Sequence, residues 1–126
     1  MKKLAVGLSC AVVASIVTFG VSETLRAQAK PPGYLVALVT VKDDMAANEY
    51  REKFMATLPA HGGKYLVRGG QMAPLYNSEG AQRVVVVQFP SFDKAKEWAA
   101  DPKVVELRPL RDKAQSVRGA LVEGSQ

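Results

Sequence analysis

The segment Tyr34–Val41 (YLVALVTV) consists almost entirely of apolar and β-branched residues and carries no charge. It is too short for an independent helix, and its composition predicts a β-strand. Successive side chains of a strand point to opposite faces of a sheet. Tyr34, Val36 and Leu38 would lie on one face, and Leu35, Ala37, Val39 and Val41 on the other. Both faces are apolar, so we expect both to be covered.

The residues after this strand predict an amphipathic helix. Lys42-Asp43-Asp44 provides side chains that suit a helix N-cap. Apolar residues then recur at spacings of three and four, as on the buried face of a helix, at Ala47, Tyr50, Phe54 and Leu58. Pro59 and the pair Gly62-Gly63 are expected to end the helix.

Three more strands and a second helical region follow along the chain. We expect the strands at Lys64–Arg68 (KYLVR), Arg83–Phe89 (RVVVVQF) and Ser116–Glu123. Met72–Tyr76 either extends the first of these or forms a short extra strand. Ser91 is a suitable N-cap for a helix that presents Phe92, Ala95, Trp98 and Ala99 on one side. Asp101-Pro102 breaks this helix, and another helical segment is expected to reach about Lys113.

The order strand, helix, strand, strand, helix, strand predicts a ferredoxin-like α+β fold. Both helices would cover one face of a four-stranded antiparallel sheet. The third strand is also apolar on both sides, because Val84 and Val86 alternate with Val85, Val87 and Phe89. A large exposed apolar face usually marks an interface. We therefore predict a homodimer through the helix-free face of the sheet.

The first 29 residues have the features of a cleavable signal peptide. A basic start, Met1-Lys2-Lys3, precedes the uncharged and mostly apolar stretch Leu4–Val21, and Ala27-Gln28-Ala29 places small residues before Lys30. Cleavage there would give a periplasmic or secreted protein, and the alternative is an N-terminal membrane anchor. The expected divisions are signal peptide 1–29, linker 30–33, domain 34–124 and tail 125–126.

The charge distribution and the scarcity of cysteine and histidine exclude several functions. The chain has a formal net charge of +5, but acids and bases are interspersed, which argues against nucleic-acid binding. Cys10 is the only cysteine and lies in the leader, so the mature chain would lack a thiol nucleophile and a thiolate metal site. His61 is the only histidine, which excludes a multi-histidine metal site. We therefore expect neither a metal nor a cofactor.

The stretch His61–Gly70 (HGGKYLVRGG) resembles the signature GG-[RK]-[FY]-L-x-R-G-G of the family named domain of unknown function 1330. Val86–Ser91 (VVQFPS) resembles its second motif, and the resemblance continues in order from Tyr34 to Gly124. It implies a relationship to the dimeric α+β barrel proteins. The chain departs from the family where Gln88 replaces a frequent Glu and where Val104-Val105 replaces a segment with a Tyr. These departures remove an acid and an aromatic ring, which weakens an inherited acid–base mechanism.

Four residues are candidates for binding a ligand, and each has a structural alternative. Arg68 and Arg111 could bind a carboxylate or pair with an acid of the protein. His61 could act as a base or interact with the last carbonyls of a helix. Gln88 could orient a ligand or form a hydrogen bond in the core. Trp98 is expected to be a packing residue, and catalytic residues are not identified.

Two classes of function remain open. In the first class, the protein binds a small anionic or carbonyl-bearing molecule in a cavity between the helices and the sheet, or acts on such a molecule as a cofactor-independent enzyme. Related dimeric barrels include monooxygenases and isomerases, which is an analogy from fold. The other is a non-catalytic dimeric accessory protein of the cell envelope. The sequence alone leaves open whether the protein is an enzyme.

Overall fold

The computed structural model describes residues 30–125, and the predicted leader 1–29 lies outside them. The described elements, in chain order, are β1 (Gly33–Val41), α2 (Asp44–Thr57), the 3-10 turn η1 (Pro59–His61), β2 (Lys64–Arg68), β3 (Arg83–Phe89), α3 (Phe92–Ala100), α4 (Pro102–Val105), α5 (Arg108–Ala114) and β4 (Gln115–Glu123). None of the helices in this part of the chain is long and apolar enough to cross a bilayer.

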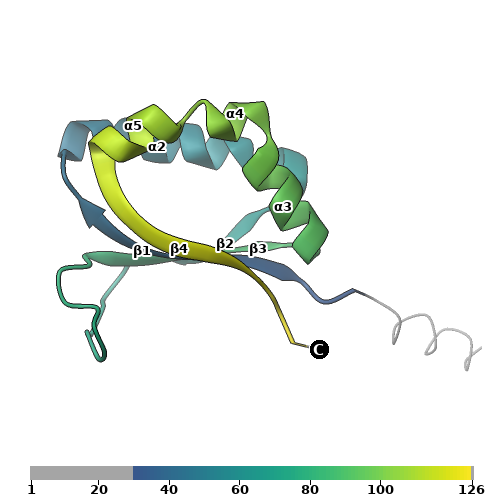
Figure 1. Ribbon diagram of the computed structural model, residues 1–126, viewed down its shortest axis with the longest axis horizontal. Coiled ribbons are helices and arrows are strands. Elements are labelled where there is room, and N and C mark those ends of the chain that lie inside the picture. The colour runs from purple at the N-terminus through teal and green to yellow at the C-terminus, as the bar shows by residue number, and fades with distance from the viewer. Residues whose placement is uncertain (1–29, 126) are drawn as a thin grey trace, which may run out of the picture. The chain divides into compact units, whose positions relative to one another are not determined.

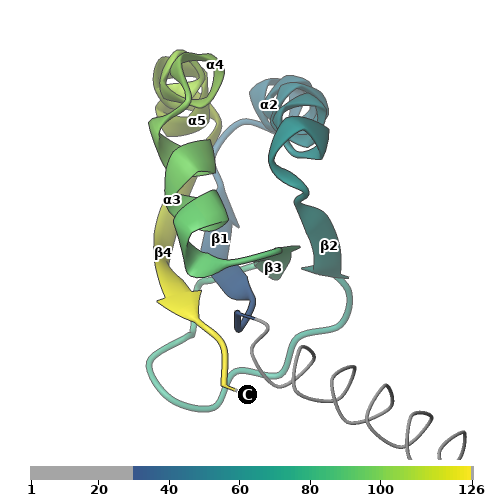
Figure 2. The ribbon, with the colours of Figure 1, turned by 90° about the vertical axis from the view of Figure 1, so that its right-hand side faces the viewer.

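The four strands form one antiparallel sheet in the order β2-β3-β1-β4 (Figure 2). Within the sheet, Leu35 of β1 pairs with Val87 of β3 on one side and with Leu121 of β4 on the other. This order, with a helical crossover before β2 and another before β4, is the ferredoxin-like arrangement. The predicted α+β fold class is confirmed.

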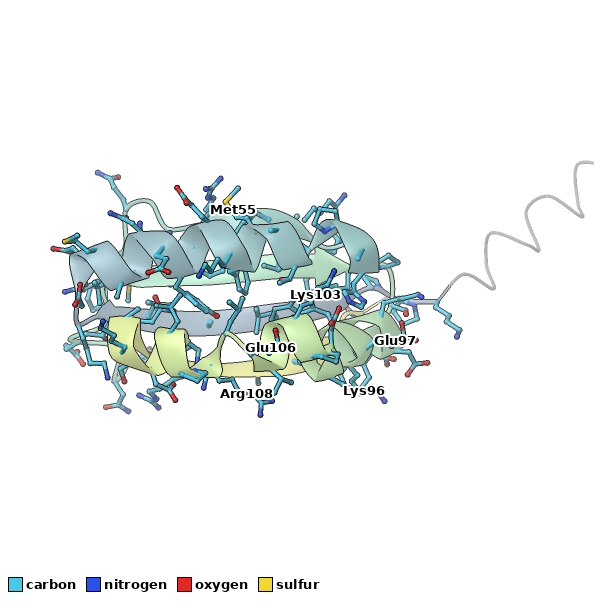
Figure 3. The ribbon with its side chains drawn as sticks, turned by 90° about the horizontal axis from the view of Figure 1, so that it is seen from above. Met55, Lys96, Glu97, Lys103, Glu106 and Arg108 are labelled. Carbon is cyan, nitrogen blue, oxygen red and sulfur yellow. The ribbon has the colours of Figure 1, made fainter. Side chains whose placement is uncertain are left out.

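All of the described helices lie on one face of the sheet in two rows (Figures 1 and 2). One row is α2, above β2, and the other is α3, α4 and α5, above β4 (Figure 2). Seen from above, the two rows run side by side along the strands (Figure 3). Ala37 and Val39 are buried beneath the helices, whereas Val36, on the opposite face of β1, is 40% exposed.

Local sequence chemistry sets the helix boundaries. The Asp43 carboxylate accepts a hydrogen bond from the backbone N–H of Ala46 at the start of α2, and the Ser91 hydroxyl accepts one from Lys94 at the start of α3. These contacts satisfy amide groups that have no partner within the helix. After η1, Gly62 adopts the left-handed conformation with φ 69°, which a residue with a Cβ disfavours.

The main core cluster joins α2, β3 and α3. Its buried members are Phe54, Leu58, Val87, Phe89, Ala95 and Trp98. The indole N–H of Trp98 donates to the Thr57 hydroxyl at 2.9 Å, so the one polar atom of that side chain is satisfied within the core. Trp98 therefore packs and supports the helices, as expected.

The connection between β2 and β3 contains no strand, so the expectation of one at Met72–Tyr76 is wrong. Gly69 and Gly70 have φ values of 76° and 94°, which end β2 by turning the chain out of extended geometry. Leu75 and Tyr76 are 73% and 82% exposed, so burial does not favour strand pairing here. The connection lies on the helix-free side of the sheet (Figure 1). The Thr40 hydroxyl donates a hydrogen bond to the Gly80 carbonyl in this connection at 3.0 Å.

The helical region after Pro102 is two short helices rather than one segment. α4 ends at Val105, and α5 begins at Arg108 with Pro109 in its first turn. Proline lacks a backbone N–H and cannot continue a helix from the preceding turn, which explains the interruption.

Candidate functional site

A cavity of about 650 Å³ lies between the helices and the inner face of the sheet. Its apolar wall includes Leu35 and Ala37 of β1, Val85 of β3 and Leu121 of β4. Tyr50, Phe54, Tyr65 and Trp98 supply aromatic surface. A concave site with apolar walls and a few polar groups is the usual form of a small-molecule site.

Two tyrosines bring hydroxyl groups to this cavity. The rings of Tyr50 and Tyr65 both pack against Phe54, with centroids 5.8 and 6.0 Å away. Neither hydroxyl has a hydrogen-bond partner among residues 30–125. Burial raises the pKa of both hydroxyls above the ordinary value, against the opposing charges of Arg111 near Tyr50 and of Arg68 near Tyr65. Both phenols are therefore protonated at neutral pH and available as donors.

The charged groups that line the cavity are mostly positive. They are Lys42, Arg51, Arg83, Arg108 and Arg111, with Asp112 as the acid among them. The Asp112 carboxylate accepts from Nε and Nη2 of Arg111 at 3.1 and 3.0 Å. In the described chain, no acid pairs with any of the other four cations. The cavity is therefore suited to an anionic ligand.

Arg51 and Arg83 bring buried donors to this site. The Nε atom of each is inaccessible to solvent and lacks an acceptor in the described chain. Burial lowers the pKa of Arg83 below its ordinary value, and the positive charge of Arg51 lowers it further. Buried polar groups normally have a partner, so two unsatisfied guanidinium donors beside one cavity require an explanation.

A buried amide adds a further polar group. Gln115 is 8% exposed and lines the cavity at the start of β4. Its side chain makes no hydrogen bond within residues 30–125. It can donate to or accept from a bound molecule.

Of the four residues predicted from sequence, Arg111 lines the cavity. Arg68 lies beside it at the edge of the sheet, with Nη2 2.9 Å from the sulfur of Met55 and Cζ 5.1 Å from the ring centre of Tyr65. Met55, labelled in Figure 3, projects from α2. Arg68 is exposed, so it stands at the rim rather than among the lining residues.

His61 and Gln88 lie away from the cavity lining. His61 Nε2 is 2.7 Å from Asp101 Oδ2, which ties η1 to the break between α3 and α4. Gln88 pairs with Tyr34 and Lys64 and alternates with the buried Val87 and Phe89, so it belongs to the helix-free face. The four predicted residues therefore do not converge on one site.

Sequence reasoning missed Arg51, Arg83, Tyr50, Tyr65 and Gln115 as cavity residues. One signal was present, because Arg83 shares its strand parity with Val85, Val87 and Phe89 and so lies on the same face of the sheet. The strand is apolar on both faces, so its sequence did not show which face meets the helices. Among residues 30–125, His, Asp and Glu side chains form no group of three that could hold a metal ion.

The fold and the cavity define a ferredoxin-like α+β protein with a basic, aromatic-lined pocket. The pattern of the family described as Domain of unknown function (DUF1330) matches residues 32–125, and the chain belongs to that family. The family resemblance noted in the sequence is thereby confirmed. A search of curated proteins finds no match.

Several solved structures have the same fold. A protein of unknown function from Rhodopseudomonas palustris aligns over 85% of this chain and 93% of its own, with a TM-score of 0.62 and 20% identity. A dimeric ferredoxin-like protein of unknown function from Bacteroides fragilis aligns over 76% and 99%, with a TM-score of 0.50 and 17% identity. A variant of SnoaB, a cofactor-independent oxygenase from Streptomyces nogalater, aligns over 76% and 95%, with a TM-score of 0.51 and 15% identity.

Proposed function

We propose that this protein is an exported, homodimeric binding protein for a small organic molecule held between its helices and its sheet. The observation that carries the proposal is the cavity of about 650 Å³, large enough for a metabolite-sized ligand. Its polar groups include two tyrosine hydroxyls, the Gln115 amide and the unpaired arginines. None of these groups has a hydrogen-bond or acidic partner among residues 30–125.

The second candidate is a cofactor-independent enzyme, as SnoaB is. The chemistry of the lining residues favours binding over proton abstraction. A general base has to reach the substrate with a free basic group. His61 is outside the lining and paired with Asp101, and Asp112 is paired with Arg111. The phenols of Tyr50 and Tyr65, with raised pKa values, are acids rather than bases at neutral pH.

The proposed homodimer forms through the helix-free face of the sheet, because that face exposes apolar side chains. Val36 and Val122 on that face are 40% and 47% exposed in one protomer, and Val84 and Val86 lie between them and β2. A second copy packed on this face would remove the apolar surface from water. The Bacteroides fragilis protein, described as dimeric, supports this assembly by analogy of fold.

Export rests on the basic start, apolar stretch and Ala27-Gln28-Ala29 of the leader. Intact-mass analysis of the protein made in a bacterial host should give a chain that begins at Lys30. A full-length chain recovered with the membrane would support the anchor instead.

Binding is tested by narrowing the cavity. Val117 and Val105 are both 37% exposed, but Val117 lines the cavity and Val105 does not. A panel of single-ring aromatic acids and their amides is screened against the wild type by thermal shift and calorimetry. We expect at least one member to bind once per protomer, and Val117→Trp to weaken it by about tenfold because the side chain occupies ligand volume.

Val105→Trp is the matched control and should leave binding unchanged. If no member of the panel binds, or if both tryptophan variants lose binding equally, the cavity is not the binding site.

A further inference from the structure

Three arginines from three different elements surround one tyrosine at the β2 side of the cavity. Arg51 comes from α2, Arg68 from β2 and Arg83 from β3. The positive charges of all three act on the Tyr65 hydroxyl, and Arg51 and Arg68 each act on Arg83. The geometry agrees, because Arg68 Cζ lies 5.1 Å from the ring centre of Tyr65, and Arg51, Tyr65 and Arg83 line one cavity. No carboxylate of residues 30–125 pairs with any of them.

This cluster is unfavourable for the empty protein. Like charges in a partly buried site repel one another, and burial removes the water that would screen them. The buried Nε groups of Arg51 and Arg83 have also given up their water without gaining an acceptor. No carboxylate of residues 30–125 offsets this repulsion, whereas an anion bound beside the guanidinium groups would reduce it.

We propose that Arg51 and Arg83 form a carboxylate site, so that the cavity selects small organic acids over their neutral counterparts. This inference rests on the proposed binding function and names the class of ligand. Guanidinium groups bind the two oxygens of a carboxylate through paired N–H donors. Arg51 and Arg83 both line the cavity, and neither pairs with an acid of residues 30–125, so their guanidinium groups are available to the two acceptor oxygens of one carboxylate.

The other lining residues determine which body, attached to the carboxylate, fits the cavity. The rings of Phe54 and Trp98 lie 5.5 Å apart in an edge-to-face arrangement, and Tyr50 and Tyr65 flank Phe54. Such a surface packs well against a flat apolar or aromatic body. The hydroxyl of Tyr65 sits beside the arginines, where it can donate to the same carboxylate. The ligand class is therefore a carboxylic acid on a compact apolar or aromatic body.

The test compares benzoate with benzamide, which differ mainly in charge, using calorimetry and thermal shift on the mature chain. We expect benzoate to bind at least about tenfold more tightly than benzamide, since hydrogen bonds to a charged acceptor are stronger. Arg83→Gln and Arg51→Gln should each reduce benzoate affinity by about 10- to 100-fold and leave benzamide affinity within about twofold. Lys113→Gln, which removes a charge from α5 outside the cavity lining, should change neither.

A second readout separates a ligand site from a structural role. Because the cluster is repulsive without an anion, Arg83→Gln and Arg51→Gln should keep or raise the melting temperature of the ligand-free protein. A lower melting temperature with equal loss of both ligands would make these arginines structural and overturn the inference.

The two levels of the proposal fail in different ways. If neither benzoate, benzamide nor any other member of the panel binds, the binding function itself fails. If benzoate and benzamide bind equally, and the arginine variants change nothing, the function stands and the carboxylate site is wrong. Tighter binding of phenyl phosphate than of benzoate would also contradict the assignment to a carboxylate.

Discussion

Asp101 shows how one side chain can join two elements. Its Oδ2 accepts from His61 Nε2 at 2.7 Å, and its Oδ1 accepts from the backbone N–H of Lys103 at 2.9 Å. The first contact holds η1, and the second caps α4. The hydrogen bond from His61, followed by the one from Lys103, lowers the pKa of this carboxyl below its ordinary value. His61 is thus placed in a structural pair rather than among the cavity residues.

This lowered pKa predicts how stability depends on pH. A carboxyl whose pKa is depressed by folding stabilises the protein above its unfolded pKa, and the effect disappears as the pH falls through its folded pKa. Asp101→Asn keeps an oxygen to cap α4 but removes the charge. We expect the variant to melt below the wild type near neutral pH, and the difference to close as the pH falls through the lowered pKa of Asp101. Melting curves at several pH values check this, and a difference independent of pH would contradict it.

At the scale of elements, α3 is a nine-residue helix that depends on its cap. Ser91 accepts from Lys94 N–H at 3.1 Å, and so short a helix has little intrinsic stability. Ser91→Ala should lower the free energy of unfolding by about 1 kcal/mol, measured by urea denaturation. Ser125→Ala, beyond the end of β4, is the control and should be within about 0.5 kcal/mol of wild type. Equal midpoints for the two variants would show that the cap contributes nothing.

The helices and strands also show which predictions from the sequence were reliable. The strands at Tyr34–Val41 and Arg83–Phe89 and both N-caps could be predicted, because alternation and capping involve neighbours in the chain. The extra strand at Met72–Tyr76 could not be excluded, because its apolar residues resemble those of an edge strand. Its lack of a partner is decided by the left-handed Gly69-Gly70 turn, which directs the chain away from β3.

At the scale of the whole molecule, the structure shows which valines the dimer prediction concerns. Val86 pairs with Val36 on the helix-free face, whereas Val85 lines the cavity. Val86→Lys should convert a dimer into monomers or aggregates, because a twofold interface would bury two unpaired charges. Analytical ultracentrifugation measures the mass. Val105→Lys, a charge of the same kind on α4, should remain dimeric, and a monomeric wild type at micromolar concentration would disprove the assembly.

The sequence by itself determined the fold class. Periodicity, turn residues and caps depend on neighbouring residues, so the sequence could predict the individual strands and helices. The order of these elements then predicted a ferredoxin-like sheet whose strand β1 is apolar on both faces. It also limited the chemistry, because a single histidine and the lack of cysteine in residues 30–126 left arginine as the group best suited to recognise a ligand.

Only the tertiary structure decided which of those groups share a site. Arg51, Tyr65 and Arg83 belong to α2, β2 and β3, and strand register and helix packing bring them to one cavity. The same register turns Gln88 to the opposite face, and the Asp101 contact keeps His61 at the helix ends. Contacts between segments far apart in the chain depend on how every element packs at once, so no local pattern in the sequence could identify them.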